Sequence, residues 1–389
     1  MTGPELPILP GATLGVMGGG QLGRMWAHAA QQMGYFTAVL DADPHSPAGT
    51  VSHHHLQAGY LDEAALVALA QCSAAVTTEF ENVPAAALQS LAEQRPVSPP
   101  AHAVAICQDR VLEKAHFTQC GVPCAPYAVI ETGQQLAAVS GDVLPGILKT
   151  SRLGYDGKGQ ARVNTHEELA AAWSRLQQAP CVLEKMLPLA LEVSVIVARG
   201  HDGKAVHLPL QQNLHRDGIL AVTQVPAPDV SALLQERAVA QAYAVAASMN
   251  YVGVLCVEFF VLQDGTLVAN EMAPRPHNSG HYSMDACDVS QFELQVRTMT
   301  GNPLTAPRLH SSAVMLNLLG DLWFDPEGRE CPPPWVDVLA LPGVHLHLYG
   351  KTEARIGRKM GHLTVTASSP FDAKKVALQA ATLLGLPAF

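Results

Sequence analysis

Charged residues are scarce in this chain of 389 residues: they make up 15% of it, well below the usual share of about a quarter. Basic residues are the scarcer kind, with 24 Lys and Arg against 34 Asp and Glu and a formal net charge of -10. A nucleic-acid partner requires a broad basic face, so this balance argues against nucleic-acid binding. Any anionic ligand must instead be met by a local cluster of Lys and Arg.

Three other features are missing. The eight cysteines form no C-x-x-C pair, which argues against a zinc knuckle or a thioredoxin-like motif and favours free thiols in a reducing compartment. Residues 1–10 carry no basic segment, so we expect no signal peptide. The most apolar stretch, 243–262, is interrupted by Asn250 and Glu258, which favours a buried helix and strand over a membrane span. We therefore expect a cytoplasmic protein without a membrane partner.

The length and the 48% of hydrophobic residues predict two or three domains with sizeable cores. A strand, a glycine turn, a helix and a second strand follow one another over residues 12–41, which is the pattern of a βαβ unit. The first hundred residues thus predict an open parallel sheet, and the proline-rich segment 95–100 predicts its boundary. The fold class is α/β. Further elements are expected as a strand-rich segment at 126–192, a helix at 230–249, a hairpin at 252–272 and a strand at 345–349.

The first glycine loop, Gly18–Gly23, satisfies G-x-G-x-x-G, and Asp41 follows about twenty residues later. Its glycines would let the backbone approach a phosphate at a helix N-terminus. The pattern leaves three interpretations open: an NAD(P)-dependent oxidoreductase, a site for another phosphorylated ligand such as a sugar, or a tight turn without a ligand.

The second glycine loop contains Gly154, Gly157 and Gly159 and follows Lys149 at the end of an apolar run. With the cations Arg152 and Lys158, it is typical of a loop that folds over a polyphosphate, although it lacks the G-K-[ST] of a Walker A motif. The alternative is a flexible hairpin with solvated cations.

Paired glutamates are predicted in the hairpin at 252–272. If Asp264-Gly265 is a two-residue turn, Glu258 lies opposite Glu271, on the same face as the pair Phe260 and Ala269. Two facing carboxylates repel each other unless a cation lies between them, and oxygen ligands favour Mg²⁺. The alternative is that one glutamate pairs with Arg275 and the other is solvated.

Two groups of histidines are less informative. Three adjacent histidines at 53–55 cannot all reach one metal ion, so we expect them at the surface. His345 and His347 share one face of a strand, and the pattern does not decide between a core and a site position.

The order of a glycine-rich loop after a strand Lys, an acid-bearing strand at 182–187 and paired glutamates resembles the ATP-grasp superfamily. Within it, longer motifs spread over nearly the whole chain resemble the 5-(carboxyamino)imidazole ribonucleotide synthases. These motifs are GGGQLGRM at 18–25, DADPHSPAG at 41–49, EFENV at 79–83, GYDGKGQ at 154–160, NLHRDGIL at 213–220, NEMAPRPHNSGH at 270–281 and GRKMGH at 357–362.

The resemblance implies an ATP-dependent carbon–nitrogen ligase that carboxylates 5-aminoimidazole ribonucleotide with bicarbonate, through carboxyphosphate, in purine biosynthesis. It implies ATP and two Mg²⁺ ions as ligands, a homodimer, and a hand-off of product to the next enzyme, a mutase. The implied domains are a Rossmann-like domain (1–107), an ATP-grasp domain (108–303) with a lid (122–187), and a small β-rich C-terminal domain (304–389). Another ATP-grasp ligase, or a nucleotide-binding regulator without turnover, stays open as an alternative.

The resemblance also implies roles for individual residues. ATP would contact Arg110, Lys149, Gly154, Tyr155, Asp156, Gly157, Lys158, Gly159, Gln160, Glu184, Lys185, Met186, Leu187, Glu192, His215, Asn270 and Glu271. The backbone of 184–187 would bind adenine, and Glu192 the ribose. The ribonucleotide would contact Gly20, Gln21, Leu22, Glu79, Asn82, His277, Asn278, Ser279, Lys351, Arg358 and Lys359. Glu258 and Glu271 would hold Mg²⁺. As catalytic residues, we expect Asp156 to accept a proton and Arg275 and Lys359 to stabilise anionic charge.

Overall fold

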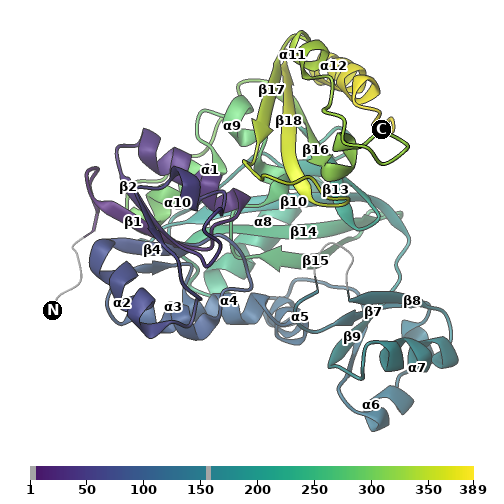
Figure 1. The fold of residues 1–389 in the computed structure, drawn as a ribbon. Helices are drawn as coiled ribbons and strands as arrows, with labels where there is room; N and C mark the ends of the chain where they lie inside the picture. Colours follow the sequence, from purple (N-terminus) through teal and green to yellow (C-terminus); the bar gives the residue numbers. More distant parts are fainter. Residues whose placement is uncertain (1–5, 155–158) are drawn as a thin grey trace.

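The computed structural model describes residues 6–154 and 159–389 and contains three β-sheets (Figure 1). The first sheet is parallel, with the strand order β3-β2-β1-β4-β5. This sheet confirms the predicted open α/β fold of the first hundred residues. It comprises β1 (Thr13–Met17), β2 (Phe36–Leu40), β3 (His54–Leu56), β4 (Ala75–Thr78) and β5 (Val97–Ser98), with helices α1 (Gln21–Gln32), α2 (Glu63–Cys72), α3 (Ala85–Ala92) and α4 (Ala101–Cys107).

The second sheet is large, and its central strands β10 and β14 form most of the protein's main core together with α8. Its strands are β10 (Leu189–Arg199), β11 (Ala205–His207), β12 (Gln211–Arg216), β13 (Ile219–Val225), β14 (Gly253–Leu262), β15 (Leu267–Ala273), β16 (Ser312–Leu319), β17 (Val344–Leu348) and β18 (Lys359–Ala367). Because β16 pairs with β13, the C-terminal strands β16–β18 extend this sheet instead of forming a separate one. The accompanying helices are α5 (Arg110–Gln119), α8 (Ala232–Ser248), α9 (Ser283–Ala286), α10 (Gln291–Thr300), α11 (Trp335–Leu339) and α12 (Pro370–Leu383).

The hairpin of β14 and β15 differs from its prediction in one respect. Leu262 and Thr266 close the loop, and Gly265 adopts a left-handed φ of 81°, so three residues form the turn instead of two. Phe260 therefore pairs with Val268, and the predicted pair of Phe260 and Ala269 is wrong. An irregularity between Glu258 and Phe259 restores the register, so that Glu258 lies opposite Glu271 as predicted.

The third sheet is a small antiparallel one, with the order β6-β9-β7-β8, and it projects at the lower right of Figure 1. It lies in the segment that the sequence predicts as a lid. Its elements are β6 (Tyr127–Ile130), β7 (Gly146–Thr150), β8 (Gln160–Val163), β9 (Cys181–Lys185), α6 (Gly133–Ala137) and α7 (His166–Arg175).

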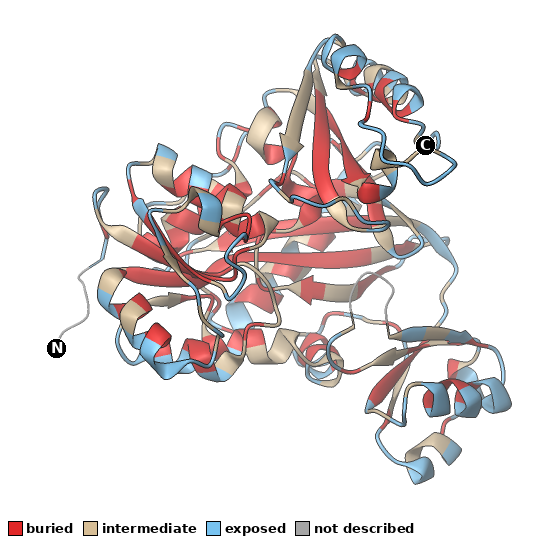
Figure 2. Cartoon of the chain, in the orientation of Figure 1, coloured by how far each residue is buried: buried red, intermediate tan, exposed pale blue. Residues whose placement is uncertain are grey.

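Buried residues follow the inner strands of the large sheet, whereas the helices of the small sheet have broad exposed faces (Figure 2). The eight cysteines are all free thiols. In the part of the chain that the structure describes, no helix is both long and apolar enough to span a membrane.

Candidate active site

A cavity of about 690 Å³ lies where the three sheets meet, and elements from all three contribute to its wall. Most of the residues predicted for ATP, ribonucleotide and metal reach it, although they are far apart in the sequence. Those that line the cavity are Gln21, Leu22, Glu79, Asn82, Arg110, Lys149, Gly154, Gln160, Glu192, His215, Glu258, Asn270, Glu271, Arg275, His277, Asn278 and Lys359.

The other predicted residues lie elsewhere. Tyr155, Asp156, Gly157 and Lys158 are outside the described residues. The remaining predicted residues are described by the structure but do not line the cavity. They are Gly20, Gly159, Glu184, Lys185, Met186, Leu187, Ser279, Lys351 and Arg358.

Some of these residues make hydrogen bonds to main-chain carbonyl groups instead. Lys351 donates a hydrogen bond to the carbonyl oxygen of Lys359 at 2.5 Å, and Arg358 donates to the carbonyl oxygen of Glu353 at 2.9 Å. Of the basic run at 351–359, the cavity wall therefore receives Lys359. The amides of Lys185 and Met186, predicted to lie near adenine, donate to carbonyl oxygens of Pro126 and Pro145.

The first glycine loop is filled by acidic side chains of the protein itself. The amides of Gly20 and Gly23 donate to the Glu79 carboxylate at 2.7 and 2.9 Å, and the amide of Gly19 donates to Asp41 at 2.7 Å. Asp41 also accepts the hydroxyl of Tyr60 at 2.7 Å. A dinucleotide needs these amides for its pyrophosphate and this acid for its ribose. Because the amides and Asp41 are already engaged by other groups of the protein, the motif does not offer the binding groups that an NAD(P)-dependent oxidoreductase needs.

Two cations, Arg110 and Lys149, lie together at one part of the cavity, where the sequence predicts the ATP phosphates. Asp109 caps α5 by accepting the amide of Val111, so the helix presents Arg110 at its first turn. Arg110 lies 3.2 Å from Glu271 and donates to the carbonyl oxygen of Gly154 in the glycine loop. Lys149, at the end of β7, lies 3.1 Å from Glu184. Burial lowers the pKa of Lys149, and the nearby Glu184 carboxylate opposes this change.

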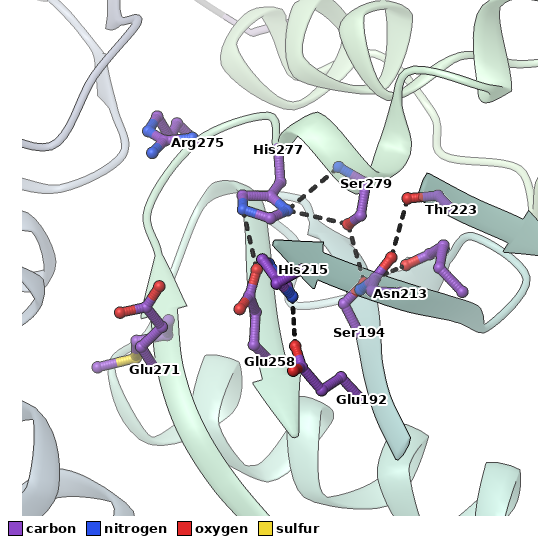
Figure 3. Close-up of polar contacts among 12 residues, drawn as sticks. Glu192, Ser194, Asn213, His215, Thr223, Glu258, Glu271, Arg275, His277 and Ser279 are labelled. Atoms are coloured by element: carbon purple, nitrogen blue, oxygen red, sulfur yellow. Dashed lines mark hydrogen bonds and ion pairs between the residues drawn. The ribbon is translucent and has the colours of Figure 1, made fainter. Parts of the chain in front are cut away.

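Glu258 and Glu271 approach the cavity from neighbouring strands (Figure 3). Burial and the charge of Glu271 raise the pKa of Glu258, whereas Arg110 and Lys149 outweigh burial and lower the pKa of Glu271. Neither glutamate pairs with Arg275, which lies 2.5 Å from Glu81 instead, so the alternative pairing considered from the sequence is wrong.

These residues fit a Mg²⁺ ion. Burial, and after it the charge of Glu271, raises the pKa of Glu258, and a cation between the two carboxylates would relieve their repulsion. The buried side-chain oxygen of Asn270, between them in sequence, has no hydrogen-bond partner among the described residues and offers a third oxygen donor. An oxygen-only donor set is the kind that Mg²⁺ prefers.

A hydrogen-bond network of histidine and serine side chains lies next to Glu258 (Figure 3). His277 accepts the amide of Ser279 at Nδ1, so its Nε2 carries the proton and donates to Glu258 at 3.0 Å. Ser279 accepts a hydrogen bond from Ser194 at 2.8 Å. Ser279, which does not itself line the cavity, thus orients His277.

His215 pairs with Glu192 across the strands β12 and β10 (Figure 3). Burial opposes the charge of His215, but Glu192 and the glutamates near it outweigh burial and raise its pKa to about 9. His215 is therefore protonated at neutral pH.

Among the residues in or next to the cavity wall that were not assigned a role from the sequence, four are charged or ionisable groups with partners in the site. Lys114 lies one turn after Arg110 on the same helix, a spacing that the sequence does display. Glu81 is in the motif 79–83, and His281 ends the motif 270–281, so the sequence motifs could have identified both as site residues. Glu113 accepts the amide of Met272 at 2.6 Å, and burial raises its pKa to about 7. Nothing in the sequence indicates that Glu113 and Met272 approach each other.

Comparison with known proteins assigns this architecture to a class. Residues 115–292 match the ATP-grasp domain, residues 11–108 the ribonucleotide synthetase preATP-grasp domain, and residues 313–376 the phosphoribosylaminoimidazole carboxylase C-terminal domain. The protein is thus an ATP-grasp enzyme.

Relatives along the whole chain define the family within that class. The chain is 45% identical over 360 residues to N5-carboxyaminoimidazole ribonucleotide synthase of Brucella melitensis, covering 92% of this chain and 97% of the relative. The Bacillus subtilis synthase is 40% identical, with 92% of each chain covered. The chain belongs to the N5-carboxyaminoimidazole ribonucleotide synthase family, as its motifs predict.

Solved structures agree with this assignment. The Staphylococcus aureus N5-carboxyaminoimidazole synthetase complexed with ADP superimposes with a TM-score of 0.88 at 37% identity, covering 97% of this chain and 98% of that one. The Aspergillus clavatus synthase in complex with ADP and 5-aminoimidazole ribonucleotide gives a TM-score of 0.87 at 30% identity, covering 96% and 98%.

Proposed function

We propose that this protein is the ligase that joins a carboxyl group from bicarbonate to the exocyclic amine of 5-aminoimidazole ribonucleotide and converts ATP to ADP and phosphate. One observation carries the proposal: a single cavity is lined both by Arg110, Lys149 and Glu271 and by Glu79 and Lys359. Such a cavity can hold a nucleotide triphosphate next to a second anionic substrate. The similarity to a synthase that binds ADP together with the ribonucleotide supports the same pairing.

In the mechanism, Arg110 and Lys149 bind and orient the ATP phosphates, and Glu192 with His215 holds the ribose end. Glu258, Glu271 and Asn270 would hold Mg²⁺, two ions in our proposal. When bound, Mg²⁺ supplies positive charge that offsets the charge of the phosphates. A bicarbonate oxygen attacks the γ-phosphorus in line and ADP leaves, which gives carboxyphosphate.

The second step forms the carbon–nitrogen bond. The amine attacks the carboxyl carbon of carboxyphosphate, or CO₂ released from it, while phosphate leaves and the amine loses a proton. Arg275 and Lys359 stabilise the anionic charge, and Arg275 is fixed for this role by its contact with Glu81. We propose that Asp156 accepts the proton and that closure of the loop 151–160 excludes water.

Further parts of the proposal come from the family resemblance. We propose the domain limits 1–107, 108–303 and 304–389 with a lid at 122–187, a homodimer, a cytoplasmic location and a hand-off of the labile product to a mutase.

The test is phosphate release by the purified protein with ATP, Mg²⁺, bicarbonate and the ribonucleotide, each omitted in turn. We expect full release only with all four. Release that does not depend on the ribonucleotide would contradict the substrate assignment, and ATP binding without any release would indicate a regulator. Thermal protection by NAD, but not by ATP with Mg²⁺, would favour an oxidoreductase.

The variant Lys359→Ala tests the proposed ribonucleotide site. We expect the KM for the ribonucleotide to rise about tenfold or more, with the KM for ATP changed less than about threefold, because one cation of the anion site is lost. Lys375→Ala, on the exposed face of α12, is the matched control. An equal loss for both substrates would contradict the assignment.

A further inference from the structure

Lys114 carries a charge that the roles assigned so far leave unexplained. Its side chain is completely buried on α5 and is absent from the described wall of the cavity, so we do not place it in contact with ATP. Its ammonium lies 3.2 Å from Glu184 and donates a hydrogen bond to the carbonyl oxygen of Asn270 at 2.7 Å. A buried ammonium is costly unless such partners are fixed in place, so the surroundings of Lys114 are specific to a cation.

Glu184 is shared between two lysines. One carboxylate oxygen lies 3.1 Å from Lys149 and the other 3.2 Å from Lys114, and the exposed fractions of the three side chains are 12% for Lys149, 5% for Glu184 and 0% for Lys114. The two lysines outweigh burial and hold the pKa of Glu184 at about 2, so the carboxylate is ionised. Two ammonium groups and one carboxylate leave one net positive charge. Without Lys114, Glu184 and Lys149 would form a neutral pair.

The same contacts join two parts of the fold. Glu184 and Lys149 belong to the small sheet, on β9 and β7, whereas Asn270 belongs to β15 of the large sheet, next to Glu271. Lys114 therefore contacts both sheets at the part of the cavity proposed to bind the ATP phosphates.

We propose that Lys114 is a positioning residue of the ATP site, which balances the charge of Glu184 so that the group of Lys149, Glu184 and Lys114 keeps one net positive charge for the phosphates, and which fixes β9 against β15. This inference rests on the proposed function in one point, the contact of Lys149 with ATP.

The test measures ATP affinity in five variants, by titration calorimetry with Mg²⁺ in the full chain. Lys114→Met leaves Lys149 neutralised by Glu184, and we expect the Kd for ATP to rise about tenfold, an effect typical of losing one charge in a buried site. Lys114→Arg keeps the charge and should stay within about threefold of the wild type. Lys375→Met is the exposed control and should bind as the wild type does.

The decisive variant is the double substitution Lys114→Met with Glu184→Gln. It removes one charge of each sign, restores one net positive charge at Lys149, and should recover about fivefold or more of the affinity lost in Lys114→Met. A purely structural role for Lys114 predicts that the double variant binds no better than the single one, and that result would overturn the inference. Should Lys114→Met fail to fold, comparison of Glu184→Gln with the double variant decides: ATP binding tighter in Glu184→Gln, which has the additional cation, supports the inference, and equal binding overturns it.

The outcomes also separate the two proposals. A wild type that does not bind ATP, or releases phosphate without the ribonucleotide, overturns the proposed function. A wild type that passes both tests, with Lys114→Met binding ATP as tightly, overturns only the role of Lys114.

Discussion

Two buried histidines predict that this protein loses stability in mild acid. His281 and His362 are 1% and 0% exposed, and their ring centroids lie 4.7 Å apart, between the segment 278–281 and β18. His281 accepts a hydrogen bond from Gln291, and His362 contacts the Tyr349 hydroxyl at 3.0 Å. Burial lowers the pKa of both rings well below the usual value, and the charges of nearby histidines add to the effect.

An acidic residue, Asp285, lies at the outer end of this group of histidines. His347 stacks on His362 with a centroid distance of 4.5 Å and lies 2.9 Å from Asp285, which His345 also approaches at 3.7 Å. His345 and His347, which the sequence left undecided, thus lie at a contact between β17 and α9. On the cavity side, Lys359 and Arg275 face His281 and further disfavour its protonation.

The sign and size of the effect follow from linkage. The folded state keeps both rings neutral, whereas the unfolded chain binds protons as the pH falls below about 6.5. The stabilisation is therefore fully present above that pH and is lost below it. Between pH 7 and pH 5, a ring that stays neutral in the folded state contributes a loss of about 2 kcal/mol in the free energy of unfolding, which is the largest loss that one ring can give.

The assay is urea unfolding followed by circular dichroism at pH 7 and pH 5, for the wild type and His362→Gln. The glutamine does not titrate and can still contact Tyr349, so the loss between the two pH values should be smaller in the variant, by as much as about 2 kcal/mol. His45→Asn, an exposed position, should keep the wild-type loss. Equal losses in the wild type and His362→Gln would refute the reasoning, whatever their absolute stabilities.

Three further predictions concern the cavity. In Gly20→Ala, the added Cβ would lie 2.4 Å from a Glu79 oxygen, so we expect the KM for the ribonucleotide to rise about tenfold in steady-state kinetics, while Gly59→Ala, in open space, has no effect. Glu271→Gln removes a carboxylate from the proposed Mg²⁺ site, so the Mg²⁺ concentration for half-maximal phosphate release should rise about tenfold, and an unchanged midpoint would exclude it as a ligand. The pKa of His215 is raised to about 9, so ATP affinity measured by titration should be constant from pH 7 to 8 and weaken above pH 9, and His215→Asn should abolish this dependence.

Local features were predictable because they are encoded over a few neighbouring residues. The βαβ unit of β1, α1 and β2 follows from hydrophobic periodicity and a glycine turn. The pairing of Glu258 with Glu271 was also correct, but a three-residue turn and a compensating irregularity, instead of the expected two-residue turn, produce it. The turn type could not be predicted because Asp-Gly is compatible with both loop lengths.

The partners of charged residues were not predictable in the same way. Arg275 pairs with Glu81, 194 positions earlier, and Glu79 occupies the amides of a glycine loop 56 to 59 positions before it. The sequence identifies such groups as candidates, but only packing decides which two approach each other.

The sequence by itself determined the fold class, the family and most of the residues around the cavity, since periodicity, turn residues and long motifs are properties of contiguous chain. The tertiary structure alone decided how the few cations are used. Lys149 and Lys359 reach the cavity wall, Lys351 holds a main-chain carbonyl, and Lys114 balances Glu184 from beneath. Charge is counted along the chain, but its effect depends on distance and burial, which exist only once the three sheets have come together.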